Sequence, residues 1–275
     1  MAHESDLIGP HIDPPLSLIP PVLSSLKTKV FQTTLRDVRR LSKDGIPDTD
    51  DQAGYIAHNS GLWGIAHASM LISLGSPDPR IRNGSVSALA ADANLAAQLG
   101  LAGVCFHVGY EKGHDSRQKA LDEVIRKLSE VIGKLKPGAR VLLENGCEGT
   151  ELGQTVEEVA YVAKGVGASA DQLGFVLDTC HLHVAGFDLA ADVAPERLAS
   201  DLTESGMMQV LTCLHLNDAQ AACGSHRDRH AAPGVGTIGD GLLRLLGHSS
   251  FSEIPVILEM GMDAYERGRA FLAAG

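Results

Sequence analysis

The chain of 275 residues has few aromatic side chains, no excess of basic residues and no hydrophobic run long enough to cross a bilayer. Aromatic residues make up 4% of it and the formal net charge is −11, so a broadly basic surface for nucleic acid is not expected. The charge is not decisive, because carboxylates that ligate metal ions count in the sum although the ions neutralise them. The acidic, proline-containing start lacks the pattern of a secretory signal, which predicts a cytoplasmic or nuclear location without membrane attachment.

The sequence also lacks paired cysteines. Its five cysteines are an odd number and contain no CxxC pair, and three of them lie inside apolar runs. Buried free thiols are therefore expected in preference to disulfides or a thiolate zinc site. The five are Cys105, Cys147, Cys180, Cys213 and Cys223.

Short apolar runs alternate with longer amphipathic stretches along the whole chain. Each run is four to seven residues long and is bounded by Gly, Pro, Asp or Asn, as expected for strands that are buried on both faces. This alternation, in a chain about as long as a barrel enzyme (~250 residues), predicts a single (β/α)₈ TIM barrel of the α/β class that occupies residues 1–275 as one domain. The predicted strands are 7–11, 29–33, 64–67, 103–107, 141–144, 174–178, 210–216 and 255–259, and the clearest helices are 86–99, 116–135, 155–164, 195–205 and 241–247.

Side chains that can bind metal ions recur at the carboxyl ends of these runs. In a barrel those ends share one face, where active sites are built. Six of the eight runs carry such a residue, whereas His11, at the end of the first run, is interpreted as a structural residue. The six are His67, His107, Glu144, Asp178, His215 and Glu259.

Two further spacings add ligands to the same face. Asp178 and His181 are three residues apart across a strand end, and Asp228 and His230 are two residues apart. Histidines mixed with carboxylates suit catalytic Zn²⁺ or Mn²⁺ better than a closed structural zinc. Nine candidate ligands are too many for one ion, so two or three ions are expected, which is typical of phosphate ester hydrolysis. His183 and His226 are interpreted as residues that either support the ligands or contact the substrate.

Several motifs together resemble the endonuclease IV family (apurinic/apyrimidinic endonuclease family 2) of the xylose isomerase-like TIM barrel superfamily. They are DTCH at 178–181, HLND at 215–218, DRH at 228–230, FHVG at 106–109 and LEN at 143–145. The resemblance is strong from about residue 64 to residue 260 and weaker before it. It implies a zinc-dependent enzyme that hydrolyses the phosphodiester 5′ to abasic sites in double-stranded DNA during base excision repair.

The resemblance also implies three Zn²⁺ ions per chain, with Mn²⁺ as a possible substitute, in a monomer. Glu144 is the implied catalytic residue, because it would bridge the first two ions beside the hydroxide that attacks phosphorus. The implied sets are His67, His107 and Glu144 for the first ion, Glu144, Asp178, His215 and Glu259 for the second, and His181, Asp228 and His230 for the third.

The expected DNA contacts match the family less closely. Met70 and Leu71 follow the first ligand where the family commonly has a bulky aromatic and a leucine that enter the duplex. Val235 replaces a residue that is usually charged. The residues expected to contact DNA are Arg36, Met70, Leu71, Arg227 and Arg229.

A sugar isomerase or epimerase of the same superfamily is the main alternative. Such an enzyme shares the histidine and carboxylate ligands at the strand ends but binds one or two ions and uses carboxylates for proton transfer. It has no need of His181, Asp228 and His230 together, and all three are present. A barrel kept only as a binding or scaffold module would have lost ligands, and none of the nine is missing.

Overall fold

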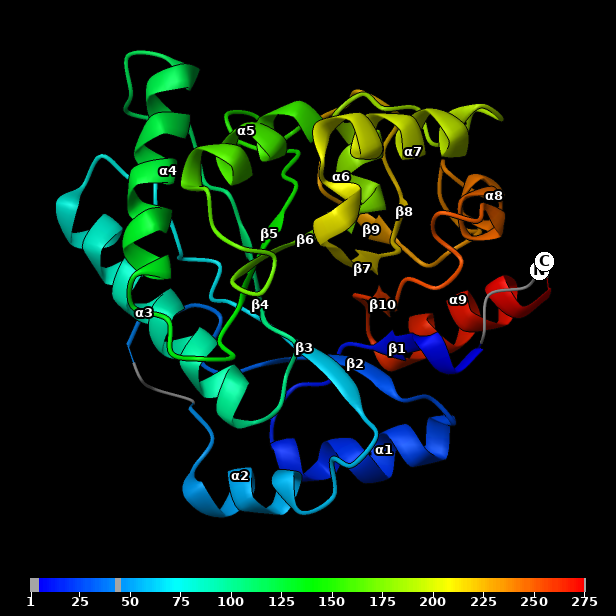
Figure 1. Ribbon diagram of the computed structural model, residues 1–275. Helices are drawn as coiled ribbons and strands as arrows, with labels where there is room; N and C mark the ends of the chain where they lie inside the picture. Colours follow the sequence, from blue (N-terminus) through cyan, green and yellow to red (C-terminus); the bar gives the residue numbers. More distant parts are fainter. Residues whose placement is uncertain (1–4, 43–45, 275) are drawn as a thin grey trace.

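The computed structural model describes residues 5–42 and 46–274, which form eight parallel strands surrounded by helices (Figure 1). The strands pair in the order β1-β10-β7-β6-β5-β4-β3-β2. This is the predicted (β/α)₈ barrel, with the first strand placed beside the last. The strands are β1 (Ile8–Pro10), β2 (Val30–Thr34), β3 (Trp63–His67), β4 (Val104–His107), β5 (Val141–Glu144), β6 (Leu173–Asp178), β7 (Leu211–His215) and β10 (Val256–Leu258).

The barrel closes between β1 and β2. His11 and Gln32 form a parallel bridge there, and the backbone N–H of Ile12 donates a hydrogen bond to the carbonyl of Gln32 at 2.7 Å. Gly9 allows this close approach, because a Cβ atom at its position would lie 1.9 Å from the carbonyl oxygen of Val30. The closure brings the side chains of the first two strands to the same mouth as those of the other six.

Helices cover the outside of the barrel, and many of them begin at a capping side chain. Asp78, Ser116 and Thr155 each accept a hydrogen bond from a backbone N–H in the first turn of the helix that follows. No helix among residues 5–42 and 46–274 is long and apolar enough to span a membrane. The helices are α1 (Ile19–Leu26), α2 (Thr49–Ile56), α3 (Pro79–Gln98), α4 (Arg117–Ile132), α5 (Val156–Val166), α6 (Thr179–Val184), α7 (Ala194–Ser205), α8 (Gly241–Gly247) and α9 (Met262–Ala274).

Two cores hold the barrel together. The larger lies between the strands and the surrounding helices, and the smaller fills the inside of the barrel. The inner core takes one residue from each of seven strands, which makes it a packed layer and leaves no pore. These residues are Val30, Ile65, Cys105, Leu142, Val176, Cys213 and Ile257.

Candidate metal centre

A layer of polar side chains lies directly above the inner core. Because side chains two residues apart in a strand point to the same face, the residue that follows each inner-core residue by two also points toward the barrel axis. In all seven strands that residue is polar. The layer consists of Gln32, His67, His107, Glu144, Asp178, His215 and Glu259.

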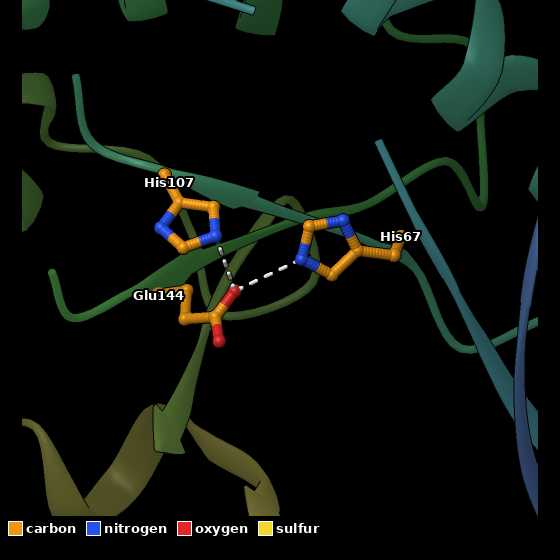
Figure 2. Close-up of side chains that lie close together, drawn as sticks. All are labelled: His67, His107 and Glu144. Carbon is orange, nitrogen blue, oxygen red and sulfur yellow. Dashed lines mark hydrogen bonds and ion pairs between the residues drawn. The ribbon is translucent and has the colours of Figure 1, made fainter. Parts of the chain in front are cut away.

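The first group of donors gathers around one carboxylate. Figure 2 shows the imidazoles of His67 and His107 converging on the Glu144 carboxylate at the ends of β3, β4 and β5. The Nε2 atoms of His67 and His107 lie 3.1 and 3.7 Å from Glu144 Oε2. One donor atom from each residue falls within 4.8 Å of the others, a spacing that suits a shared metal ion.

The second group uses the other oxygen of the same carboxylate. His215 Nδ1 lies 2.8 Å from Glu144 Oε1 and 3.0 Å from Glu259 Oε2. Asn217 donates hydrogen bonds to Asp178 Oδ2 at 2.6 Å and to Glu259 Oε2 at 3.2 Å, which holds these two carboxylates side by side. Glu144 therefore faces both groups, as a bridging ligand would.

The third group lies outside the strand layer. His181 belongs to α6, and Asp228 and His230 come from the segment that leads into the short β9 (His230–Ala231), which pairs with β8 (Asp218–Ala219). The Asp228 carboxylate lies 3.4 Å from His181 Nε2 and 3.2 Å from His230 Nε2, and the two Nε2 atoms are 3.4 Å apart. Three donors thus converge from two separate segments.

Four of the clustered histidines direct one ring nitrogen away from these groups, toward an oxygen that can only accept a hydrogen bond. The donating nitrogen carries the proton, so the opposite nitrogen keeps its lone pair for a metal ion. This arrangement fits a divalent cation at all three groups. The pairs are His67 Nδ1 with the Ala68 carbonyl at 2.9 Å, His107 Nδ1 with Glu151 Oε1 at 3.0 Å, His181 Nδ1 with the Asn145 carbonyl at 2.9 Å and His215 Nε2 with Gln32 Oε1 at 2.8 Å.

Without an ion, the histidines and carboxylates neutralise each other. Burial opposes charge on Glu144, but the imidazoles of His215 and His107 outweigh burial and hold its pKa well below the usual range. Burial likewise opposes the protonation of His230, but the charge of Asp178 and the hydrogen bond to Asp228 raise the pKa of His230 to about 9. A metal ion that enters must displace such protons, which makes its affinity depend on pH.

A cavity of about 420 Å³ opens in front of the three groups. His11, Asp13 and Met70 line it beside the donor residues, so His11 faces the site as well as bridging β1 to β2. No lysine or arginine is among the described residues that line this cavity. The positive charge that faces a phosphate group seated there would therefore come from imidazolium groups or from bound metal ions.

Arg36 does not face this cavity, which contradicts the expectation that it contacts DNA. Its side chain is 2% exposed and forms a buried ion pair with Asp92 of α3. Its remaining donors bond to the carbonyls of Leu41, Ser42 and Ala88. Every guanidinium nitrogen has a partner inside the protein, so none is available to a duplex.

The other residues expected to contact DNA remain accessible. Met70 is 72% exposed and lines the cavity, and Leu71 beside it is also exposed. Arg227 and Arg229 are exposed on either side of Asp228. Val235, which stands where the family usually has a charged residue, is exposed too.

The sequence left the roles of two further histidines undecided between supporting the ligands and contacting the substrate. His183 is buried and bonds to Leu189 and Thr237, whereas His226 is exposed.

Sequence reasoning missed residues that orient the donors, among them Gln32 and Glu151. Gln32 is fully buried; its amide oxygen accepts from His215 and its amide nitrogen donates to Glu259 at 2.6 Å. The buried Glu151 carboxylate holds His107. A signal for Gln32 was present, because it follows Val30 by two residues just as each strand-end ligand follows an inner-core residue. No comparable periodicity marks Glu151, which lies in a loop.

Comparison with known proteins agrees with this architecture. The family described as "Xylose isomerase-like TIM barrel" matches residues 27–274. A protein of Haloquadratum walsbyi named "Probable endonuclease 4" is 33% identical over 231 residues, which cover 82% of this chain and 80% of that protein.

Solved structures share the same fold. The crystal structure of endonuclease IV from Thermus thermophilus has a TM-score of 0.80 at 25% identity and covers 98% of this chain and 99% of its own. A D-tagatose 3-epimerase-like protein has a TM-score of 0.74 at 18% identity, covering 97% of this chain and 96% of its own. The second likeness concerns the fold alone.

Proposed function

The chain belongs to the endonuclease IV family of xylose isomerase-like TIM barrels, and from that premise we propose that it hydrolyses the phosphodiester 5′ to abasic sites in DNA for base excision repair. It is an enzyme of the DNA-cleaving hydrolase class. Its products would be a 3′-hydroxyl and a 5′-deoxyribose phosphate. We further propose that it acts as a monomer and that residues 1–275 work as one domain.

The proposed cofactors are three Zn²⁺ ions, held by the three donor groups described above. When bound, such ions supply a water nucleophile at neutral pH and stabilise the oxygens that attack and leave phosphorus. The observation that carries the proposal is the third group, His181, Asp228 and His230, which converges beside the two strand-end groups. A sugar isomerase or epimerase needs only the strand-end groups, so the third group favours phosphodiester hydrolysis.

The residues of the chain have separate tasks in this proposal. Glu144 presents one oxygen to each of the first two groups and so fixes their positions relative to each other. Asn217 fixes the carboxylates of Asp178 and Glu259, and Glu151 orients His107. The rigid strands set these positions before substrate arrives, so little reorganisation is needed during the reaction. We propose that Met70, exposed at the cavity, and the neighbouring exposed Leu71 contact the duplex, with Met70 wedged against a base pair.

One experiment tests the site and the substrate together. Purified protein is analysed for metal content and then incubated with a duplex that carries a single abasic analogue. We expect two to three zinc or manganese ions per chain and cleavage on the 5′ side of the analogue, with an undamaged duplex of the same sequence left intact. A content of at most one ion after reconstitution, or an uncut abasic duplex, would refute the proposal.

A further inference from the structure

Cys147 lies beside the third donor group, in the loop after β5. The residue is 1% exposed. Its sulfur, a ring nitrogen of His181 and a carboxylate oxygen of Asp228 all lie within 4.8 Å of one another. A thiolate, an imidazole and a carboxylate at this spacing form a donor set that zinc accepts.

The backbone of Cys147 is held from both sides. Its N–H donates to Glu151 Oε2 at 2.8 Å, and the same carboxylate orients His107 in the first group. Its carbonyl accepts from His226 Nδ1 at 3.1 Å. His226 lies two residues before Asp228, so the segment that delivers the third group is tied to Cys147. The backbone that carries the sulfur is thus held by one residue that orients the first group and one from the segment of the third group.

The thiol of Cys147 differs from the other buried thiols in having no hydrogen-bond partner among the described residues. Cys105 donates to Glu144 Oε2 at 3.2 Å, Cys180 to the carbonyl of Arg229 at 3.8 Å and Cys213 to the carbonyl of Leu214 at 3.5 Å. Cys180 also lies near Asp228 and His230, but its sulfur already has a partner. Cys147 is therefore the buried thiol whose sulfur is left for a ligand.

We propose that Cys147 supplies a thiolate ligand to the ion held by His181, Asp228 and His230, an inference that rests on the proposed function. The thiol proton leaves to solvent as the sulfur–metal bond forms. Cys147, His181, Asp228 and His230 together would supply four protein ligands, the number that zinc commonly takes. Because thiolates select zinc over manganese, this position is specific for zinc, whereas the two groups built from nitrogen and oxygen accept either ion.

The absorption spectrum of bound Co²⁺ shows whether a thiolate is among its ligands, independently of enzyme activity. Metal-free protein is loaded with Co²⁺ in the absence of DNA, and its near-ultraviolet spectrum is recorded. We expect a sulfur-to-cobalt charge-transfer band that disappears in Cys147→Ala and persists in Cys180→Ala, the matched control for a buried thiol near Asp228. Persistence of the band in Cys147→Ala, or its loss only in Cys180→Ala, would overturn the proposal.

A measurement on the unaltered protein covers the case in which Cys147→Ala does not fold. X-ray absorption of the zinc-loaded wild type should show sulfur at about 2.3 Å from zinc. The amplitude of this signal should correspond to one zinc–sulfur bond per protein chain. Three bound zinc ions without a sulfur neighbour would refute the thiolate ligand and leave the proposed function standing. Failure to bind metal at all would overturn both.

Discussion

Replacing Gln32 with glutamate should weaken the second metal position without changing the shape of the site. The Gln32 amide nitrogen lies 2.6 Å from Glu259 Oε1 and 3.1 Å from His11 Nδ1, and the amide oxygen accepts from His215. Gln32→Glu keeps the acceptor for His215 but turns the donor facing Glu259 into a second carboxylate oxygen. A buried carboxylate and a partly buried one would then face each other at hydrogen-bond distance.

The size of the effect follows from this separation. Two like charges about 4 Å apart repel by about 4 kcal/mol at an effective dielectric constant of about 20. That energy corresponds to about three pKa units, so the pair binds a proton more readily than Glu259 alone, whose pKa lies well below its usual range because burial is outweighed by the charge of His215. Repulsion from the added carboxylate displaces Glu259 from its ligand position and makes it a poorer ligand. Losing a partner that orients a metal ligand typically costs about 10- to 100-fold in metal affinity, and we expect a loss of this order.

Competition with a chromophoric chelator measures the zinc affinity of each variant. Gln209→Glu is the matched control, because it adds the same charge at an exposed position near the opposite end of β7. Its zinc affinity should equal that of the wild type. Equal affinities for Gln32→Glu and Gln209→Glu would refute the role assigned to Gln32.

Four further predictions follow from the contacts described above. Glu144→Ala should be the most damaging single ligand change, because it removes a ligand from each of the first two metal positions. Elemental analysis should show fewer bound ions, and a cleavage rate equal to that of the wild type would reject the bridging role. His230→Ala should lower the single-turnover cleavage rate by about 10²- to 10³-fold with duplex binding retained, whereas a lower Tm with an unchanged rate would indicate a structural role. In the metal-free protein, the raised pKa of His230 contributes stability that is fully present below about pH 6.5 and is lost as the pH rises through about 9. The unfolding free energy of the wild type, measured by denaturation, should therefore fall more steeply between these pH values than that of His230→Ala. Arg36→Met should cost about 3 to 5 kcal/mol of unfolding free energy by leaving Asp92 buried without its partner, while the folded variant binds duplex DNA like the wild type; selective loss of binding would contradict the buried role.

Much of the fold follows from local sequence patterns. The strand predicted at 141–144 coincides with β5, and the first predicted strand, 7–11, contains β1. These strands are buried on both faces, so they appear as continuous apolar runs with clear ends. The helix predicted at 86–99 begins earlier, at Pro79, because Asn83, Gly84 and Ser85 interrupt the apolar periodicity while Asp78 caps the true start.

The side-chain partners could not be predicted in the same way. The position of Arg36 after β2 suggested a place at the mouth, but its partner Asp92 lies 56 residues further along the chain and draws it into the interior. Gln32 contacts His215 and Glu259 across 183 and 227 residues. A strand pattern shows which face a side chain occupies, whereas its partner depends on how distant strands meet in the closed barrel.

The pairing of β1 with β10 has a consequence for how the protein is made. Ile8 pairs with Val256, and the last of the strand-layer donors, Glu259, directly follows β10 (Figure 1). During translation the amino-terminal strand must wait for the final strand to leave the ribosome before the sheet can complete. A nascent chain that ends before Val256 lacks both β10, which pairs with β1, and Glu259, a donor of the proposed second metal position. The donor layer is therefore complete only once residue 259 has been synthesised, and chains broken off earlier carry an incomplete centre.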